Sequence, residues 1–336
     1  MRTGNISLHN ISKYRAELMG YAMIGVLVGH IIAFGLSTLS TATSILLWLS
    51  SLIHTAGFLF LSGFGLFFSL SKDSDAIRFY KRRFYRFLLP FLLVAIPYFL
   101  VVTINKGESI WYYLGCISTI EFWIHGNYHG MWYIAISLVL YLAYPPLFAW
   151  YTKSHKCVWL KITFSVIVML LINVSLNYFI PEYWERVKIG MVAVPYFFLG
   201  SLVAYFVRNN NDNSLPALLI SAIVYVGALF FDINHPVVGI AKICFFVILL
   251  SIIFSLFDKT AITSQINSLF RWFGKYSLEI YILHLYFWFI IKTIFDMGSL
   301  WNILVACLLS IICCVPMHII TGKISEKINL LYSQND

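Results

Sequence analysis

The chain has 336 residues, of which 60% are hydrophobic and only 11% carry a charged side chain. Soluble globular domains have about 25% charged residues, so this composition lacks the polar surface that a water-soluble globule needs. Apolar runs of about 20 residues recur along the chain, and each is long enough to cross a bilayer as a helix. The composition therefore predicts an all-α, polytopic integral membrane protein.

Hydropathy predicts ten transmembrane helices, which together form a single membrane domain over residues 1–336. Their expected ranges are 16–37, 45–70, 84–104, 130–150, 158–179, 189–207, 215–231, 236–257, 276–295 and 299–321.

The basic residues are unevenly divided between the predicted loops. With the N-terminus placed in the cytoplasm, 18 of the 23 Lys and Arg residues fall in inner segments and 4 in outer ones. Cytoplasmic loops of membrane proteins carry such an excess, so both termini are predicted to be cytoplasmic, in a multi-pass protein of the inner (plasma) membrane. The formal net charge of +9 is then explained by orientation, and we expect no nucleic-acid partner.

The first predicted helix contains a histidine in "RAELMGYAMIGVLVGHIIAFG". At 1.5 Å per residue, His30 lies roughly 21 Å from the cytoplasmic end, in the outer half of a hydrocarbon core about 30 Å thick. Gly25 and Gly29 lie beside it and favour close contact with a neighbouring helix, which fits a packing role. Ionisable residues inside the membrane are also typical of functional sites. These residues alone leave both roles open.

A basic segment, "KDSDAIRFYKRRFYRFLLP", leads into the third predicted helix. Lys81, Arg82, Arg83 and Arg86 could act as a topology signal in contact with anionic lipid. Helical spacing also brings Arg82 and Arg83 close to Arg86, and guanidinium groups bind phosphates in a bidentate manner. A cytoplasmic ligand that carries phosphate is therefore a second interpretation.

The long external connection, 105–129, contains "WYYLGCISTIEFWIHGNYHG", which is too aromatic for a free loop. We expect it to lie in the membrane interface or to turn back toward a cavity. Farther along, "SLEIYILHLYFW" places Glu279 near the cytoplasmic end of the ninth helix, where packing or snorkelling explains it. His284 lies deeper, roughly 12 Å into that helix, and its role is open.

Six stretches follow one another in the order of a known set of signatures: "VLVGHI", "FLFLSGFGLFFSLSK", "RFYKRRFYRFLLP", "HGMWYIAISLVLYLAYPPLF", "VPYFFLGSLVAYF" and "GKYSLEIYILHLYFW". Together they resemble membrane acyltransferase family 3, the integral-membrane O-acyltransferases of bacterial envelope glycans. The resemblance spans nearly the whole chain.

The resemblance implies an acyltransferase that moves an acyl group, expected to be acetyl, from cytoplasmic acyl-CoA to a sugar hydroxyl. The acceptor would be an envelope polysaccharide or a lipid-linked glycan, and the protein would also contact membrane lipid. The resemblance implies catalytic roles for His30 and His284, since an imidazole serves as a general base or carries an acyl group. No metal is expected, and the sequence leaves formation of a homo-oligomer open.

The resemblance also suggests binding residues. The residues expected to hold the phosphates of CoA are Arg15, Arg82, Arg83 and Arg86. The residues expected to contact the sugar are His129, Trp132, Tyr133 and Glu279.

The chain departs from the family pattern in its first helix. The family often has an arginine eleven residues before the histidine, and here that position is Met19. Arg15 stands one turn earlier and is predicted to take over the cytoplasmic role. It cannot pair with His30, because the rise between them is roughly 22 Å.

Two other classes of protein fit parts of the pattern. A transporter or flippase of an acylated small molecule or lipid-linked sugar would also have ten helices and buried ionisable groups. No pair of broken-helix repeats is visible in the sequence, which argues against that class. A non-catalytic assembly subunit is the third interpretation, because Met19 replaces the usual arginine.

Overall fold

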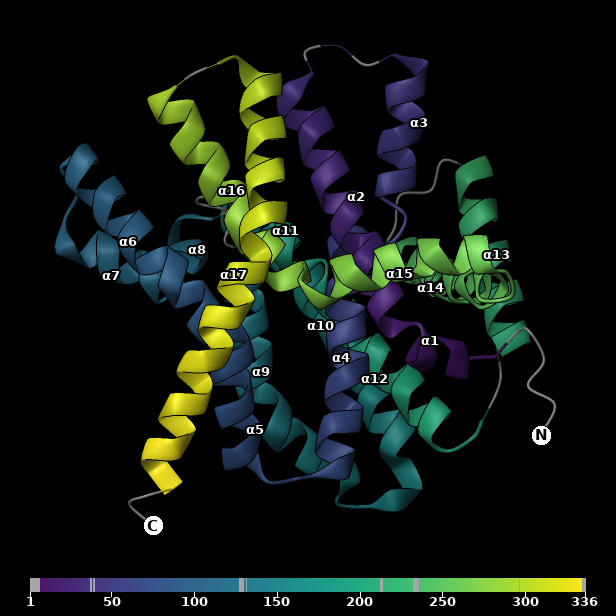
Figure 1. Cartoon of the computed structure of the whole chain (residues 1–336). Helices are drawn as coiled ribbons and strands as arrows, with labels where there is room; N and C mark the ends of the chain where they lie inside the picture. Colours follow the sequence, from purple (N-terminus) through teal and green to yellow (C-terminus); the bar gives the residue numbers. More distant parts are fainter. Residues whose placement is uncertain are drawn as a thin grey trace. The chain divides into compact units, whose positions relative to one another are not determined.

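The computed structural model describes residues 7–36, 38, 40–126, 130, 132–211, 214–231, 236–295 and 297–333. These residues are predominantly helical (Figure 1). Within them, nine helical segments are long and apolar enough to cross a membrane, and α13 (Ser214–Phe230) is a shorter apolar helix. These ten segments correspond in order to the ten predicted spans, so the prediction of an all-helical polytopic protein is confirmed.

The chain divides into two compact units. Unit 1 comprises Met1–Gly29, Leu39–Ser74 and Tyr144–Lys275, and unit 2 comprises His30–Thr38, Asp75–Ala143 and Tyr276–Asp336. Two helices pass from one unit to the other, namely α2 (Arg15–Gly35) and α9 (Trp132–Thr152).

Unit 1 is built from the first part of α2, up to Gly29, the second part of α9 and ten further elements. These are α1 (His9–Lys13), α3 (Thr41–Ser50), α4 (His54–Lys72), η3 (His155–Cys157), α10 (Val158–Phe179), α11 (Pro181–Met191), α12 (Val194–Arg208), α13, α14 (Pro236–Phe257) and α15 (Ala261–Lys275). Its most extensive helix contact is between α4 and α12.

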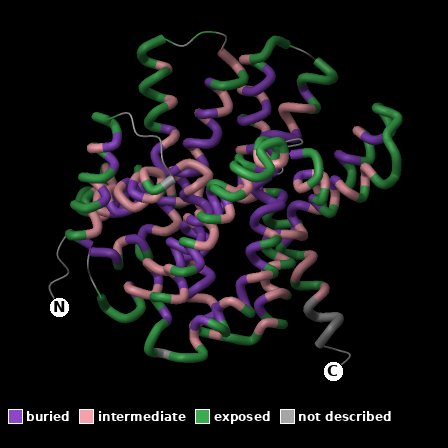
Figure 2. The backbone as a smooth tube through the Cα atoms, turned by 180° about the vertical axis from the view of Figure 1, so that it is seen from behind, coloured by how far each residue is buried: buried purple, intermediate pink, exposed green. Residues whose placement is uncertain are grey.

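Unit 2 is built from the end of α2, the first part of α9 and seven further elements. These are α5 (Ala76–Arg83), the π-helical turn η1 (Phe84–Leu88), α6 (Leu89–Lys106), α7 (Ile110–Ile117), α8 (Ile120–His125), α16 (Ser277–Ile294) and α17 (Ser299–Ser333). In this unit α16 and α17 pack side by side as a hairpin (Figure 1). Buried and exposed residues alternate along single helices, as Figure 2 shows.

Several boundaries differ from the predicted ranges. The second predicted helix, 45–70, is two helices, α3 and α4, separated by a turn at 51–53. His54, the first residue of α4, has a φ of 33°, which is rare for a residue other than glycine. The last predicted helix, 299–321, continues to Ser333, because its polar end still forms helical hydrogen bonds beyond the apolar part. Hydropathy detects apolar length, so it missed both the bend and the polar extension.

The basic segment is also helical and runs into α6 without a break. The turn η1 joins them, and the N–H of Leu89 donates to the carbonyl of Phe84, five residues back. Pro90 follows directly and lacks an N–H, and its ring clashes with the carbonyl four residues before it. Relief of that clash accounts for a widened turn at this point. Such π-turns occur frequently at functional sites.

The segment predicted to be external also has structure. The helices α7 and α8 occupy most of the predicted connection 105–129, of which residues 127–129 lie outside the described residues. Ser109 begins α7 by accepting a hydrogen bond from the N–H of Tyr112. Both helices pack against each other, and α7 also packs on α6. Its aromatic residues are therefore part of a folded hairpin, as their abundance suggested.

Glycines let the backbones of α4 and α12 touch. A Cβ atom added at Gly63 would lie 1.8 Å from the carbonyl oxygen of Phe197, and one added at Gly200 would lie 1.9 Å from that of Phe60. Since lipid is as apolar as a leucine side chain, close packing of small residues is a main force that holds membrane helices together. These two glycines therefore determine how closely the central pair of unit 1 approaches.

A second small-residue crossing joins α15 to α2. A Cβ at Gly20 would meet the carbonyl oxygen of Phe270 at 1.8 Å, and one at Gly274 would meet that of Ala16 at the same distance. Beside this crossing, Nε and Nη2 of Arg271 both donate to Oε1 of Glu17, at 2.9 and 2.7 Å. The Glu17 side chain is only 2% exposed, so this partner keeps a buried carboxylate satisfied.

We expect Gly63→Ala and Gly200→Ala each to destabilise the protein by about 1–3 kcal/mol or more, because the new methyl group forces the backbones of α4 and α12 apart. The measurement is the thermal midpoint of purified protein in detergent. Gly227→Ala on α13 is the matched control, since nothing lies within 4 Å of its Cβ position. A loss of stability as large in the Gly227 variant would contradict the close-contact explanation.

Candidate active site

Unit 2 brings together the two histidines that the sequence singled out. Nδ1 of His30, on α2, lies 2.8 Å from Nε2 of His284, on α16. The two rings are stacked, with centroids 5.1 Å apart and planes inclined by 19°. His284 is 0% exposed, whereas His30 is partly exposed. One imidazole of the pair is therefore buried and the other is partly exposed.

The hydrogen bonds define which nitrogen carries each proton in the neutral pair. Nδ1 of His284 lies 3.0 Å from the carbonyl oxygen of Ile280, and a carbonyl oxygen only accepts, so this nitrogen donates. A neutral imidazole has one N–H, so Nε2 of His284 accepts from Nδ1–H of His30. The remaining nitrogen of His30, Nε2, therefore carries a lone pair, as a general base or a nucleophile requires.

Aromatic rings line this pair. His30 stacks on Phe34 at a centroid distance of 5.0 Å, and Phe34 stacks on Trp288 at 4.5 Å. On another side, Tyr281 presents its ring to His284 at 5.7 Å and donates its hydroxyl to the carbonyl of Gly130 at 3.1 Å. These contacts limit rotation of the two imidazoles.

The residues predicted to contact the sugar differ in how they lie relative to the histidine pair. Tyr133 packs on Tyr281 with ring centroids 5.0 Å apart. Tyr281 in turn contacts His284, so Tyr133 lies behind Tyr281 and contacts the histidine pair through it. Trp132 and Tyr133 are buried, at 8% and 5% exposed, and their rings meet edge-on at a centroid distance of 6.1 Å. His129 lies outside the described residues.

Glu279 has a partner that the sequence analysis missed. Its Oε1 lies 2.6 Å from Nδ1 of His318 on α17, and the Glu279 side chain is 6% exposed against 45% for His318. The ring of Tyr276 covers His318 edge-on at 5.2 Å. A carboxylate inside a membrane span implies that a partner exists. Hydropathy cannot show that the partner of Glu279 is His318, 39 residues farther along the chain. Glu279 thus joins α16 to α17.

The three arginines of unit 2 that are predicted to bind phosphate, Arg82, Arg83 and Arg86, lie where α5 passes into η1. The guanidinium of Arg83 lies 5.3 Å from the ring centroid of Phe79 and 5.5 Å from that of Tyr141, so it makes cation–π contacts. Arg82 is partly exposed and Arg86, inside the π turn, is exposed. All three arginines therefore come from one short segment with unusual helical geometry.

Arg15 belongs to unit 1. Its Nε donates to the carbonyl of Leu61 at 3.1 Å, and its guanidinium lies against Gly65, where an added Cβ would be 2.6 Å from Nη2. The side chain is thus packed on α4, and Gly65 makes room for it. Met19, the position at which the family often has arginine, is one turn farther along the same helix.

Within the described ranges, no three His, Cys, Asp or Glu side chains gather as metal ligands would.

The chain thus combines apolar helices long enough to cross a membrane with two imidazoles in hydrogen-bond contact, one of them buried. A family model described as "Acyltransferase domain", that of acyltransferase family 3, matches residues 20–319. The match covers most of the chain and includes both histidines, so this chain belongs to that family, as the sequence resemblance predicted. No curated protein and no solved structure matches it.

Loss of His318 leaves the buried carboxylate of Glu279 without its partner. We expect His318→Ala to destabilise the protein by up to about 3–5 kcal/mol, the range for a broken buried pair. Thermal unfolding in detergent measures this. The double variant Glu279→Gln/His318→Ala should lose less than the sum of the two single changes.

The control is Lys188→Ala, which removes an exposed ion pair with Glu185 and should cost no more than about 1 kcal/mol. Strictly additive effects of the two changes at Glu279 and His318 would rule out a coupled pair.

Proposed function

We propose that this protein is a membrane O-acyltransferase that transfers an acyl group, acetyl in the first instance, from cytoplasmic acyl-CoA to a sugar hydroxyl. The acceptor is an envelope polysaccharide or a lipid-linked glycan. The observation that carries the proposal is the histidine pair, in which Nδ1 of His30 lies 2.8 Å from Nε2 of the buried His284 and the hydrogen-bond pattern makes Nε2 the nitrogen of His30 that carries the lone pair. Family membership supports the reaction class.

In the proposed reaction His30 acts as a general base. Its Nε2 takes the proton of the sugar hydroxyl as the hydroxyl oxygen attacks the thioester carbonyl carbon. The tetrahedral intermediate then collapses, the carbon–sulfur bond breaks, and the CoA thiolate leaves. That thiolate takes up the proton from His30, so the imidazole is regenerated and charge balances. The same lone pair would also serve a two-step route through an acyl-imidazole.

His284 is proposed to orient His30 and to stabilise its positive form. When Nε2 of His30 gains a proton, the Nδ1–H···Nε2 bond to His284 becomes charge-assisted, and such bonds are roughly twice as strong as neutral ones. This is the role that a buried carboxylate has in serine hydrolases. Here the second group is a neutral imidazole, held by the carbonyl of Ile280.

The donor is proposed to enter from the cytoplasmic side. Arg82, Arg83 and Arg86 would hold the phosphates of CoA, because guanidinium groups bind phosphate in a bidentate manner. Arg15 is proposed to help at the same side of the membrane. Along α2 the rise from Arg15 to His30 is roughly 22 Å, so the pantetheine arm would bridge phosphates and reaction centre.

The acceptor sugar is proposed to approach His30 from the outer side. Trp132 and Tyr133 would contribute to the wall beside the sugar, and His129 would contact its hydroxyls. Glu279 is proposed to act through its position, since it joins α16, which carries His284, to α17.

The histidine series tests the reaction. We expect His30→Ala to lower the rate of acyl transfer from labelled acetyl-CoA by 10²–10⁴-fold, the usual contribution of a general base. His284→Ala should lower it less. His284→Gln should retain more activity than His284→Ala, because an amide oxygen still accepts from Nδ1–H of His30.

His9→Ala, on α1, is the matched control and should keep the wild-type rate. Retention of more than about a tenth of that rate in His30→Ala would exclude general-base catalysis at this residue. A wild-type protein that neither hydrolyses nor transfers the thioester would favour a transporter instead.

The arginines are tested by donor affinity. We expect Arg83→Ala and Arg86→Ala to raise the Kd for acetyl-CoA, and high salt to weaken wild-type binding, because both reduce charge-assisted phosphate contacts. Arg83→Lys should recover only part of the affinity, since the planar fork is lost. Isothermal titration of purified protein measures this, with Arg208→Ala, at the end of α12, as the control. Unchanged affinity in both alanine variants would leave the segment as a lipid contact.

A further inference from the structure

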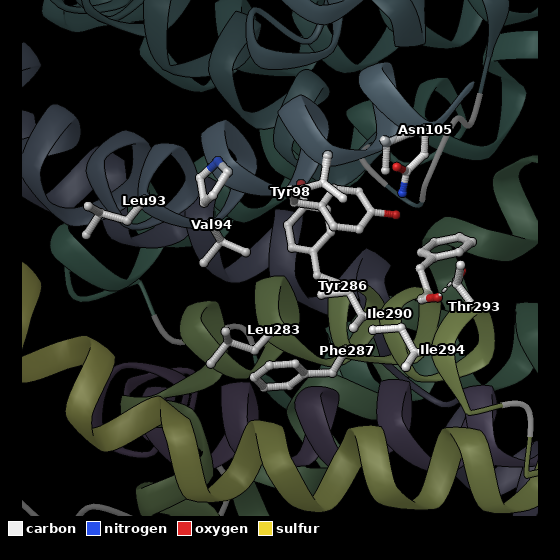
Figure 3. A pocket seen from close by; sticks show the side chains of 14 residues that line it. Leu93, Val94, Tyr98, Asn105, Leu283, Tyr286, Phe287, Ile290, Thr293 and Ile294 are labelled. Carbon is white, nitrogen blue, oxygen red and sulfur yellow. Dashed lines mark hydrogen bonds between the residues drawn. The ribbon is translucent and has the colours of Figure 1, made fainter. Parts of the chain in front are cut away.

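Unit 1 contains a cavity whose lining differs in kind from that of the groove in unit 2. The groove, between α6 and α16, is lined mainly by side chains such as Leu93, Phe287 and Ile290, which select no particular ligand (Figure 3). The cavity of unit 1 has a volume of about 380 Å³ and is bordered by α10, α11, α12 and α14. A lysine, a tryptophan, a tyrosine and two asparagines line it, and the reaction described above uses none of them.

The cavity lies near one end of the helices that border it. Asn173 is six residues before the end of α10 at Phe179, and Lys242 is six residues after the start of α14 at Pro236. At 1.5 Å per residue, both side chains start about 9 Å from the helix end. These ends fall on the side that is predicted to be external. A ligand would therefore reach the cavity from that side.

Lys242 brings a positive charge to the cavity wall without a counter-charge. Within the described part of the chain, its ammonium group has no salt bridge and no hydrogen bond. The side chain is half-buried and belongs to a segment that is long and apolar enough to span a membrane. Charged side chains in such segments almost always pair or face a polar cavity, and they mark binding sites. An anionic ligand would supply the missing counter-charge.

Asn173 adds a second group without a partner. The residue is 5% exposed, and its Nδ2 donates to the carbonyl of Met191 at 3.0 Å. Its Oδ1 is buried and accepts no hydrogen bond from any described residue. The hydroxyl of Tyr196 and the indole N–H of Trp184 also make none within those ranges. Buried polar groups are nearly always paired, so their concentration around one cavity points to a ligand that pairs with them.

Gly239 makes room for the tip of Tyr196 at the cavity wall. A Cβ added at this glycine of α14 would lie 2.3 Å from the hydroxyl oxygen of Tyr196, which comes from α12. Both residues line the cavity, and Lys242 is one turn farther along α14. The glycine thus allows the phenol hydroxyl to lie on the same wall as the ammonium group.

The free groups define the chemistry of the ligand. An ammonium group and an indole N–H only donate hydrogen bonds, so they match the oxygens of an anion, whereas the Oδ1 of asparagine only accepts and matches a hydroxyl group. The indole of Trp184 also presents an apolar ring surface, as walls of small-molecule sites commonly do. A single ammonium group and no guanidinium line the cavity within the described ranges, which fits one negative charge. At about 30 Å³ per water molecule, the volume holds roughly a dozen non-hydrogen atoms, enough for one sugar ring.

We propose that the cavity bordered by α10, α11, α12 and α14 binds a sugar that carries a carboxylate, with the carboxylate at Lys242 and a hydroxyl group at Asn173. The acceptor of the proposed reaction is then an acidic glycan. That consequence rests on the proposed acyltransferase function, whereas the binding site itself does not.

The test compares glucuronate with glucose, which has the same ring but no charge. Binding to the full-length purified protein in detergent is measured by saturation-transfer NMR. We expect the wild type to bind glucuronate at least about tenfold more tightly, the usual effect of a charge-assisted contact. Lys242→Met should abolish this preference and Lys242→Arg should keep it, while Asn173→Leu should weaken binding of both sugars. Lys188→Met is the control, since this exposed lysine of α11 does not line the cavity.

Thermal midpoints separate a binding role from a structural one. Lys242 has no partner in the described structure, so Lys242→Met should leave the midpoint unchanged or raise it. A clearly lower midpoint in this variant would assign the lysine to the stability of the fold and overturn the proposal.

Equal affinity of the wild type for glucuronate and glucose would overturn the assignment, and so would an unchanged preference in Lys242→Met. Phosphatidylglycerol in mixed micelles is the lipid probe. If it displaces glucuronate from the wild type, Lys242 is a contact for lipid headgroups and the sugar site fails.

Turnover of acetyl-CoA by the wild type is measured separately. If turnover is absent while glucuronate still binds through Lys242, the proposed function fails and the sugar site stands. If turnover is present without a preference for glucuronate, the sugar site fails and the proposed function stands.

Discussion

A polar group inside hydrocarbon must find its partner within the protein, and this constraint fixes the chemistry of the histidine pair. The carbonyl of Ile280 can only accept a hydrogen bond, so it determines which nitrogen of His284 carries the proton. That choice determines the role of each nitrogen of His30 in turn. The carbonyl oxygen of Ile280 thereby determines, through His284, which nitrogen of His30 carries the lone pair. No charged residue takes part in these contacts.

The same constraint explains the other buried polar contacts. Glu17 is paired with Arg271 in unit 1, and Glu279 is paired with His318 in unit 2. Each pair links a spanning helix to another helix, so each contributes to positioning a segment as well as to satisfying a charge. Glycines provide the complementary apolar contribution, since they allow the backbones of α4 and α12 to meet. Polar pairs and small residues together replace the hydrophobic force that is weak between helices in lipid.

Much of the fold could be predicted because the number and order of spans depend on apolar length, which is a local property of the sequence. The break at His54 interrupts an apolar run, and helix α15 is too polar to be predicted as a span, so hydropathy revealed neither of them. His30 and His284 could each be recognised as costly residues in a span. Their direct contact could not, because 254 residues separate them. His318 was missed for the same reason, and the packing of Arg15 on Gly65 depends on a neighbour in α4.

The π turn η1 has a consequence for how this chain can tolerate a change in length. A π turn contains one residue more than an α-helical turn, and here it lies between the basic helix α5 and the spanning helix α6. Deletion of one residue from Phe84–Leu88 would restore ordinary α-helical winding and keep the helix continuous. Because the wider turn needs that extra residue to complete the same rotation, Arg82 and Arg83 would face nearly the same side of the helix after the deletion. At this position the chain can therefore lose one residue without changing which way the cations face.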